Sequence, residues 1–169
     1  MTNLIEFRVI FLYFCGMYYR RKILLGLLEA FDNKLDKISL QKLLMLLGKL
    51  QTTPDFHFVP YKFGCFSFQA NADLSTMVKY NQVAVEGKNW VKTDSTNYLS
   101  LLKERDKKAI QLLKHNHGTK NADDLIKYSY VAYPYFAINS TIAKDVLSKE
   151  EYAHVKECRP VSQSTTLFT

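Results

Sequence analysis

Hydrophobic residues in the first third of the chain recur at three- and four-residue spacing, which is the pattern of amphipathic helices. Between positions 18 and 31 this stripe includes Ile23 and Leu27. A second stripe of leucines runs from 40 to 50 and directly follows Ser39, whose hydroxyl we expect to cap the helix. The pattern therefore predicts two core helices.

The periodicity then changes from helical to alternating. Aromatic and apolar residues at 56–61 predict a short strand or extended segment, and 63–67 predicts a tight turn before a third helix at about 68–80. Two alternating runs within 83–92, joined by a short loop containing Gly87, predict a β-hairpin. The order helix, helix, strand, helix, hairpin is that of a winged helix-turn-helix, which we expect over residues 17–93.

The second half of the chain is predicted to be a helical extension over 94–158. Its expected helices run from about 99 to 117, from an Asn121 cap to Tyr133, from Ser140 or Thr141 to Leu147, and from a capping box at Ser148 to about Cys158. Residues 159–169 are polar and linker-like. The expected fold class is mainly α (α+β), with a small hairpin in the front half.

Composition indicates a folded chain with one core, because 47% of its 169 residues are hydrophobic. Its 3 cysteines are scattered and form no CxxC pair, so we expect a reducing, cytoplasmic setting and no cofactor. Residues 1–16 resemble a short export leader. Bulky Tyr13 and Phe14 oppose cleavage, so an added β-strand, or a true start at Met17, is the favoured interpretation, and no membrane span is expected.

The formal net charge of +7 leans toward the first half and suggests contact with nucleic acid phosphates. The third helix, the hairpin and the basic start of the first helix supply the candidates. The predicted nucleic-acid-binding residues are Arg20, Arg21, Lys22, Lys62, Gln69, Asn71, Ser75, Thr76, Lys79, Lys88 and Lys92, with Lys42 on the same side. The alternative is that these polar residues are the solvated face of a scaffold that binds proteins.

An aromatic cluster around Pro134 is a candidate surface for docking a partner or an effector domain. Its members are Tyr128, Tyr130, Tyr133, Tyr135 and Phe136. Half-buried core tyrosines are the alternative interpretation.

Cys65 and His57 form the one Cys/His pair that is close in sequence, which would suit a thiol nucleophile with a base. A small buried cysteine is the more ordinary interpretation. His115 and His117 lie two residues apart near a helix end, where we expect a solvated pair and not a metal site. We therefore predict no catalytic residue and no metal ligand in this chain.

Three stretches resemble a known family: Met17 to Ile23, Ile38 to Leu44, and Val59 to Leu74. They resemble the N-terminal region of some bacterial proteins of the domain-of-unknown-function family number four hundred and eighty-eight. In that family the region precedes a core that opens with a strand spelled Phe-Thr-Ile-Gly-Tyr-Glu-Gly. The resemblance implies a module that is normally followed by an effector domain, with the chain end at Leu167-Phe168-Thr169 falling inside that strand.

A looser similarity connects Leu40 to Leu44, and the aromatic-Lys-aromatic-Gly turn at 61–64, with Panacea-type antitoxin domains. Those domains carry Gly-Pro at the turn, where this chain has Gly64-Cys65. Together the patterns predict a non-enzymatic recognition module that binds DNA, RNA or a partner protein. An antitoxin-like protein-interaction domain and a thiol enzyme are the alternatives.

Overall fold

The computed structural model describes residues 18–158, so the predicted leader at 1–16 and linker at 159–169 lie outside the described residues. The fold is α+β and mainly helical, with small antiparallel sheets. A first helix includes residues 18–30. The elements that follow are β1 Lys34–Asp36, α2 Lys37–Leu50, β2 Val59–Tyr61, β3 Gly64–Phe66, α3 Phe68–Lys79, β4 Val83–Glu86, β5 Asn89–Lys92, η1 Leu99–Leu101, α4 Glu104–His117, α5 Ala122–Ala132, η2 Pro134–Ala137, α6 Ala143–Val146 and α7 Lys149–Glu157.

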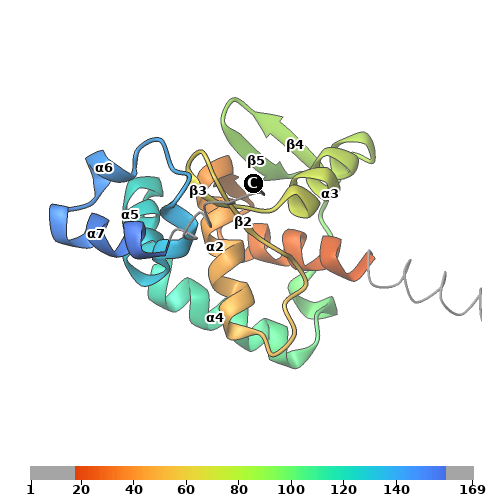
Figure 1. Cartoon of the computed structure of the whole chain (residues 1–169). Coiled ribbons are helices and arrows are strands. Elements are labelled where there is room, and N and C mark those ends of the chain that lie inside the picture. The colour runs from red at the N-terminus through yellow and green to blue at the C-terminus, as the bar shows by residue number, and fades with distance from the viewer. Residues whose placement is uncertain (1–17, 159–169) are drawn as a thin grey trace, which may run out of the picture.

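Helix α2 lies at the centre of the fold (Figure 1). It contacts α4, α5, β1 and β3. Helix α3 and the β4–β5 hairpin lie toward one end of the molecule, and α5, α6 and α7 lie toward the other (Figure 1). Helix α2 thus contacts α5 directly and the three-stranded sheet through β1, and strand β3 of the β2–β3 hairpin also contacts α2.

The three-stranded sheet has the order β1–β5–β4, with antiparallel pairs throughout. The turn after the first helix places Asp32 and Asn33 in the left-handed region, at φ 61° and 62°, which Asp and Asn tolerate better than most residues. That turn directs β1 against β5, where Leu35 pairs with Trp90. The predicted hairpin is present as β4 and β5. The sequence did not predict β1, the third strand of this sheet.

Helix α2 begins earlier than the sequence predicts. Its N-cap is Asp36, whose carboxylate accepts from the backbone N–H of Ile38 at 3.0 Å and of Ser39 at 2.9 Å. Ser39 is instead a buried residue of the first turn. The prediction of Ser39 as the cap was wrong because Asp36, which ends β1, reaches the same orphan N–H groups.

The C-terminal half contains the predicted helices, but one of them is divided in two. The expected helix over 99–117 is split into the 3-10 turn η1 and helix α4, with Leu102 in extended conformation between them. The predicted capping box at Ser148 is confirmed, and Asn121 caps α5 as expected. The helix expected from 140 or 141 is shorter, over Ala143–Val146, and follows the turn η2.

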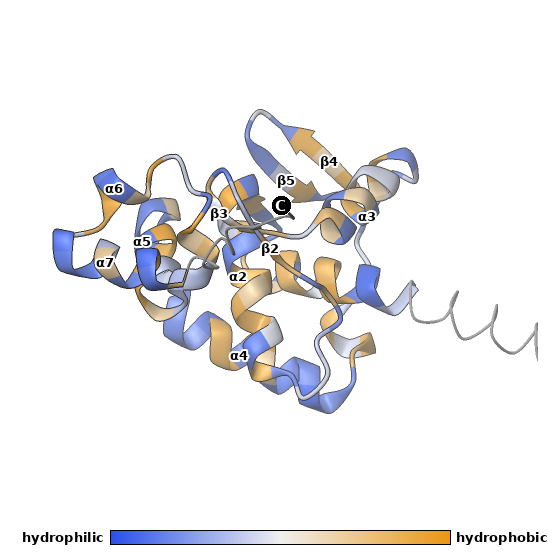
Figure 2. Cartoon of the chain, in the orientation of Figure 1, coloured by the Kyte–Doolittle hydropathy of each residue, from blue (hydrophilic) through white to orange (hydrophobic). Residues whose placement is uncertain are grey.

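The hydrophobic core is built chiefly on the first helix and α2, which carry many of the apolar residues (Figure 2). The leucines of these two helices are buried, except Leu50 at the end of α2. A second cluster joins α5 to α6 and α7 through buried Ile126, Tyr130 and Val155. Over residues 18–158, no helix has both the length and the apolar character that crossing a membrane requires.

Candidate protein-binding site

The β2–β3 hairpin presents one face to α2 and the other to solvent. Its register pairs Val59 with Phe66 and Pro60 with Cys65. Side chains of paired residues lie on the same face of a strand pair, and side chains of successive residues along a strand lie on opposite faces. Cys65 is accordingly buried, whereas Val59 and Tyr61 are exposed. The alternation therefore produces an apolar outer face on this hairpin.

Three aromatic rings cluster on that outer face. The ring centroids of Tyr61 and Phe66 lie 5.2 Å apart, those of Tyr61 and Phe68 5.6 Å, and those of Phe66 and Phe68 4.9 Å. The last two pairs meet edge to face, a favourable aromatic geometry. Tyr61 remains 40%, Phe63 47% and Phe68 59% exposed. We call Tyr61, Phe63, Phe66 and Phe68 the aromatic surface.

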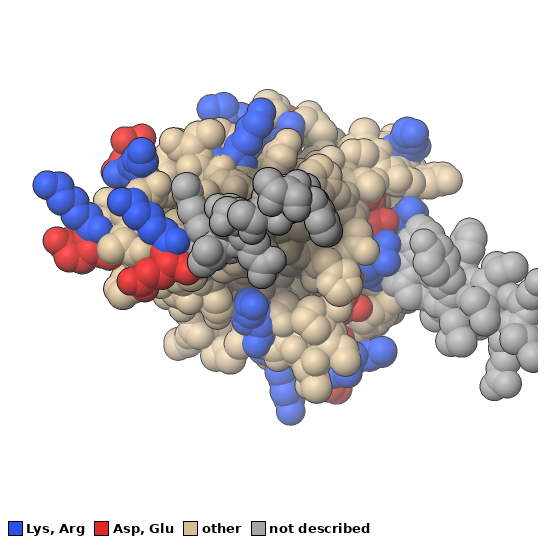
Figure 3. All heavy atoms as spheres, viewed as in Figure 1, with Lys and Arg blue, Asp and Glu red and all other residues tan. Residues whose placement is uncertain are grey.

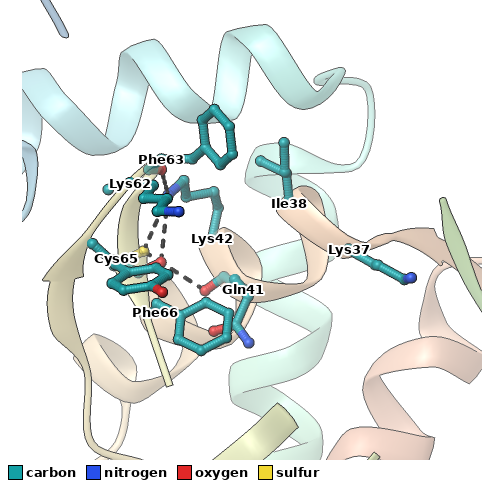
Figure 4. Close-up of a pocket in the computed structure, with 10 residues that line it drawn as sticks. Lys37, Ile38, Gln41, Lys42, Lys62, Phe63, Cys65 and Phe66 are labelled. Carbon is teal, nitrogen blue, oxygen red and sulfur yellow. Dashed lines mark hydrogen bonds between the residues drawn. The ribbon is translucent and has the colours of Figure 1, made fainter. Parts of the chain in front are cut away.

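A cavity of about 250 Å³ lies beside the aromatic surface, between the β2–β3 hairpin and the start of α2 (Figure 4). Its walls are mainly apolar. The lining residues are Lys37, Ile38, Gln41, Lys42, Tyr61, Lys62, Phe63, Gly64, Cys65 and Phe66. Among the described residues 18–158, this lining includes lysines but no Asp or Glu.

Lys42 anchors the hairpin to α2 from the floor of this cavity (Figure 4). The side chain is only 1% exposed. Its Nζ donates a short hydrogen bond to the carbonyl oxygen of Phe63 and lies 3.5 Å from that of Cys65. Nζ is also 5.7 Å from the centroid of the Tyr130 ring. A buried amine held by carbonyl groups fixes the turn of the hairpin over the N-terminal half of α2.

Gln41 provides a second anchor next to Lys42. Its side-chain oxygen accepts from the backbone N–H of Ser67 at 2.8 Å, and its amide nitrogen is 3.4 Å from the Ser67 carbonyl oxygen. Ser67 is the N-cap of α3, and its hydroxyl accepts from the N–H of Ala70. The start of α3, and with it Phe68, is therefore positioned by α2.

Burial sets the protonation chemistry of the two reactive groups at the site. It lowers the pKa of the Lys42 ammonium, an effect that the nearby Cys65 thiol opposes. Burial also raises the pKa of Cys65, and Lys42 works against that rise. Both directions follow from the cost of charge in a low-dielectric environment.

Several of the predicted nucleic-acid-binding residues make contacts within the protein. The Nε atoms of Arg20 and Arg21 lie 3.1 and 3.4 Å from the carboxylate of Asp73, a buried residue of α3. Lys92 is 6% exposed, donates to the carbonyl oxygen of Asp94, and lies over the Tyr98 ring. The cationic groups of these three residues therefore interact with partners inside the protein.

Several polar side chains of α3 also form hydrogen bonds within the protein. The hydroxyls of Ser75 and Thr76 donate to carbonyl oxygens of their own helix, and the side-chain oxygen of Gln69 accepts from the backbone N–H of His57. Asn71 and Lys79 are exposed. The expectation that Lys42 faces solvent with them is wrong, because Lys42 is buried beneath the hairpin.

The remaining predicted basic residues come from separate elements. Lys62 lies in the β2–β3 turn and Lys88 in the β4–β5 turn, both exposed, and Lys22 lies against the Tyr18 ring. On the face shown in Figure 3, Lys and Arg side chains are spread over several elements and do not gather into one patch.

The predicted docking cluster around Pro134 is divided between surface and core. Tyr128 is 40% and Tyr135 50% exposed. Tyr133 and Phe136 pack partly buried against the core. Tyr130 is fully buried, with its hydroxyl 2.7 Å from that of Ser140, so it cannot belong to an exposed docking surface in this conformation.

The structure does not bring Cys65 and His57 together. Cys65 Sγ lies 3.6 Å from Lys42 Nζ and donates to the backbone carbonyl oxygen of Gln41 at 3.8 Å, whereas His57 is exposed. His117 was expected to be solvated with His115, and that expectation is wrong. Its ring is 7% exposed and packs edge-on against Tyr128 at 4.8 Å, because the end of α4 is covered by α5. Among residues 18–158, no group of three or more His, Cys, Asp or Glu side chains is placed to hold a metal ion.

Sequence reasoning missed the aromatic surface, although its signal was present. Tyr61, Phe63, Phe66 and Phe68 fall within eight positions, on both sides of a turn glycine. Alternation around such a turn places aromatic residues on one hairpin face. Comparisons of the chain with protein-family models, with curated proteins and with solved structures each found no match.

Proposed function

We propose that this chain is a protein-recognition module, and that the aromatic surface with the adjacent cavity is the site that binds its partner. The observation that carries the proposal is the exposed three-ring cluster of Tyr61, Phe66 and Phe68 beside an apolar cavity. Aromatic residues are enriched where protein interfaces carry most of their binding energy. Rings that are held rigidly before binding lose little entropy when a partner covers them.

The charge around the cavity indicates what the partner carries. Lys62 is an exposed lining residue, whereas the Lys37 side chain points away from the cavity and its Nζ lies 5.4 Å from the centroid of the Trp90 ring (Figure 4). Within residues 18–158, the lining includes no carboxylate. A partner segment with a large apolar side chain, flanked by Asp or Glu, complements both the apolar walls and the exposed Lys62. We therefore expect an acidic segment with a Phe, Leu or similar anchor, in a separate protein or a fused effector domain.

Nucleic acid binding is the weaker candidate. A duplex binder neutralises several phosphates, and the arginines predicted for that task lie at Asp73. The order β1–β5–β4 with α2 and α3 supports a winged-helix-like arrangement interrupted by the β2–β3 hairpin. Winged helices are also used as protein scaffolds, so that arrangement does not itself favour DNA. A toxin with an acidic apolar segment is one partner compatible with the resemblance to antitoxin domains.

The experiment is a selection of binding peptides from a random displayed library on the full chain, followed by fluorescence anisotropy with the selected peptides. We expect the selected sequences to share an apolar anchor next to Asp or Glu. Phe68→Ser and Tyr61→Ser should each weaken binding about tenfold, which corresponds to about 1.4 kcal/mol. Peptides whose binding ignores both variants would contradict the proposal.

Tyr80→Ser is the matched control, because Tyr80 is another exposed aromatic residue of the same helix region, at 68% exposure. It follows α3 twelve positions after Phe68, about 18 Å along the helix axis, and should leave peptide binding unchanged. Mixed DNA and RNA form a second arm at two salt concentrations. Tight, steeply salt-dependent binding that Lys79→Glu weakens would replace the proposal with nucleic acid recognition.

A further inference from the structure

The floor of the cavity brings an amine and a thiol together. Lys42 Nζ lies 3.6 Å from Cys65 Sγ, and both side chains line the cavity of about 250 Å³ (Figure 4). Lys42 is 1% and Cys65 2% exposed. The pair comes from two elements, α2 and β3, that the fold holds in fixed register.

We propose that Lys42 and Cys65 form an oxidation-dependent covalent cross-link, a direct sulfur–nitrogen bond made when a peroxide enters the cavity. The cavity offers such a small oxidant a route to a sulfur that is otherwise covered. Once the sulfur is oxidised, the amine is the nucleophile that the structure places beside it. The proposal is independent of which partner the aromatic surface binds.

The chemistry takes two balanced steps. In the first, the Cys65 sulfur attacks hydrogen peroxide, the O–O bond breaks, and a sulfenic acid and one water form. The sulfur loses two electrons and the peroxide gains them. In the second, the Nζ lone pair attacks the sulfenic sulfur, the S–N bond forms, and the S–O bond breaks. The departing hydroxide takes a proton from the amine and leaves as water, so the protein loses two hydrogen atoms overall.

The surroundings of the pair suit the second step. Sulfenic acids condense with nitrogen nucleophiles as well as with thiols. An unprotonated amine is required, and burial shifts the Lys42 pKa in the direction that supplies one. The carbonyl oxygens of Phe63 and Cys65 hold Nζ at the sulfur.

Cross-linking would change the site as well as the two residues. The Lys42 amine would lose its positive charge, and fewer N–H groups would remain to donate to the Phe63 carbonyl oxygen. That hydrogen bond holds the turn next to Phe63 and Lys62. Oxidation would also join β3 covalently to α2 and so resist separation of the hairpin from the core.

The test is peptide mass spectrometry of the full chain after treatment with hydrogen peroxide, alkylation of free thiols and digestion without reduction. We expect a linked peptide pair containing Lys42 and Cys65, lighter than the two free peptides by two hydrogen atoms, which a dithiol reductant separates. The same treatment of the chain unfolded in urea should not give that pair. Cys158 is a free, half-buried cysteine and serves as an internal comparison for the oxidation of Cys65. It should not form a linked pair with Lys42.

Lys42→Arg is the decisive variant, because a guanidinium keeps the charge and the donors but is a poor nucleophile. In that variant the linked pair should disappear, and trapping of Cys65 sulfenic acid by dimedone should increase. Circular dichroism checks that Lys42→Arg folds. If Lys42→Arg does not fold, Cys65→Ser is the second variant in which the link should be lost. Cys158→Ser should keep the link. Sulfenic acid trapped at Cys65 of the natural chain without any link, a linked pair that has gained oxygen, or equal linkage of Cys65 to other lysines would each overturn the proposal.

Discussion

Gly64 is the backbone position on which the geometry of the candidate site depends. Its φ of +93° lies in a region that side chains rarely adopt. A Cβ at this position would overlap Cε1 of Tyr130 and lie 3.3 Å from its Cζ and 2.7 Å from Lys42 Nζ. Tyr130 cannot move aside easily, because it is fully buried and its hydroxyl lies 2.7 Å from that of Ser140. Gly64→Ala should therefore destabilise the fold for two separate reasons.

The expected loss can be divided between those reasons. A positive φ costs an alanine about 1–2 kcal/mol relative to glycine. Forcing an extra carbon into a packed interior adds about 1–3 kcal/mol. We expect Gly64→Ala to lower the free energy of unfolding by about 2–5 kcal/mol, a large share of the stability of an ordinary domain.

Gly87→Ala is the matched control, because it isolates the first cost. Gly87 also has a positive φ, 59°, but nothing lies within 4 Å of the Cβ that alanine would add. We expect it to lower the free energy of unfolding by about 1–2 kcal/mol. The assay is urea denaturation of both variants and the natural chain, followed by circular dichroism. Equal losses for the two variants, with unchanged slopes, would refute the close packing of Gly64 against Tyr130 and Lys42.

Two further predictions concern buried polar groups away from the site. Asp106→Ala should lower the free energy of unfolding by about 1–3 kcal/mol for each donor left without its acceptor, because the buried carboxylate accepts from Tyr19 at 2.7 Å and Gln51 at 2.9 Å. A loss below about 0.5 kcal/mol in denaturant titrations would contradict this, since that is a surface-like effect. Burial lowers the pKa of His117 in the folded state, so protonation favours unfolding and stability should fall as pH drops below about 6.5. Denaturation midpoints at pH 5, 6 and 7 should show a smaller decrease in His117→Gln than in the natural chain, and parallel curves would exclude this histidine as the cause.

The helices were predictable because their signals are local. The stripe that includes Ile23 and Leu27, and the caps at Asn121 and Ser148, depend on residues three or four positions apart. Strand β1 was not predictable in the same way. It is 3 residues long, and its pairing with β5 joins segments more than fifty positions apart. Because β1 ends at Asp36, that residue caps α2, which begins at Lys37, and the sequence therefore assigned the cap to the wrong residue.

The candidate site shows a different limit of sequence reasoning. A lysine at a polar position of an amphipathic helix is ordinarily solvated, and Lys42 was placed with the exposed cations for that reason. Its burial arises from the β2–β3 hairpin, whose carbonyl groups reach it from more than twenty positions away. The carboxylate partner of Arg20 and Arg21 is likewise distant in sequence, because it belongs to α3. Charge counted along the sequence does not reveal which charges the fold has already paired.

The site contains buried residues that hold the hairpin to α2 and exposed rings that are available to a partner. Substitutions in these two groups should affect stability and binding differently. Gln41, Lys42 and Gly64 are buried and hold the hairpin to α2, so their substitution should lower stability and, through it, any binding. Phe68 is 59% exposed, so the stability cost of replacing it should come mainly from its edge-to-face contacts with Tyr61 and Phe66, about 0.5–1.5 kcal/mol each. If Phe68→Ser weakens peptide binding about tenfold while the variant stays folded at the assay temperature, the ring contributes to contact with a partner in addition to its contacts within the fold.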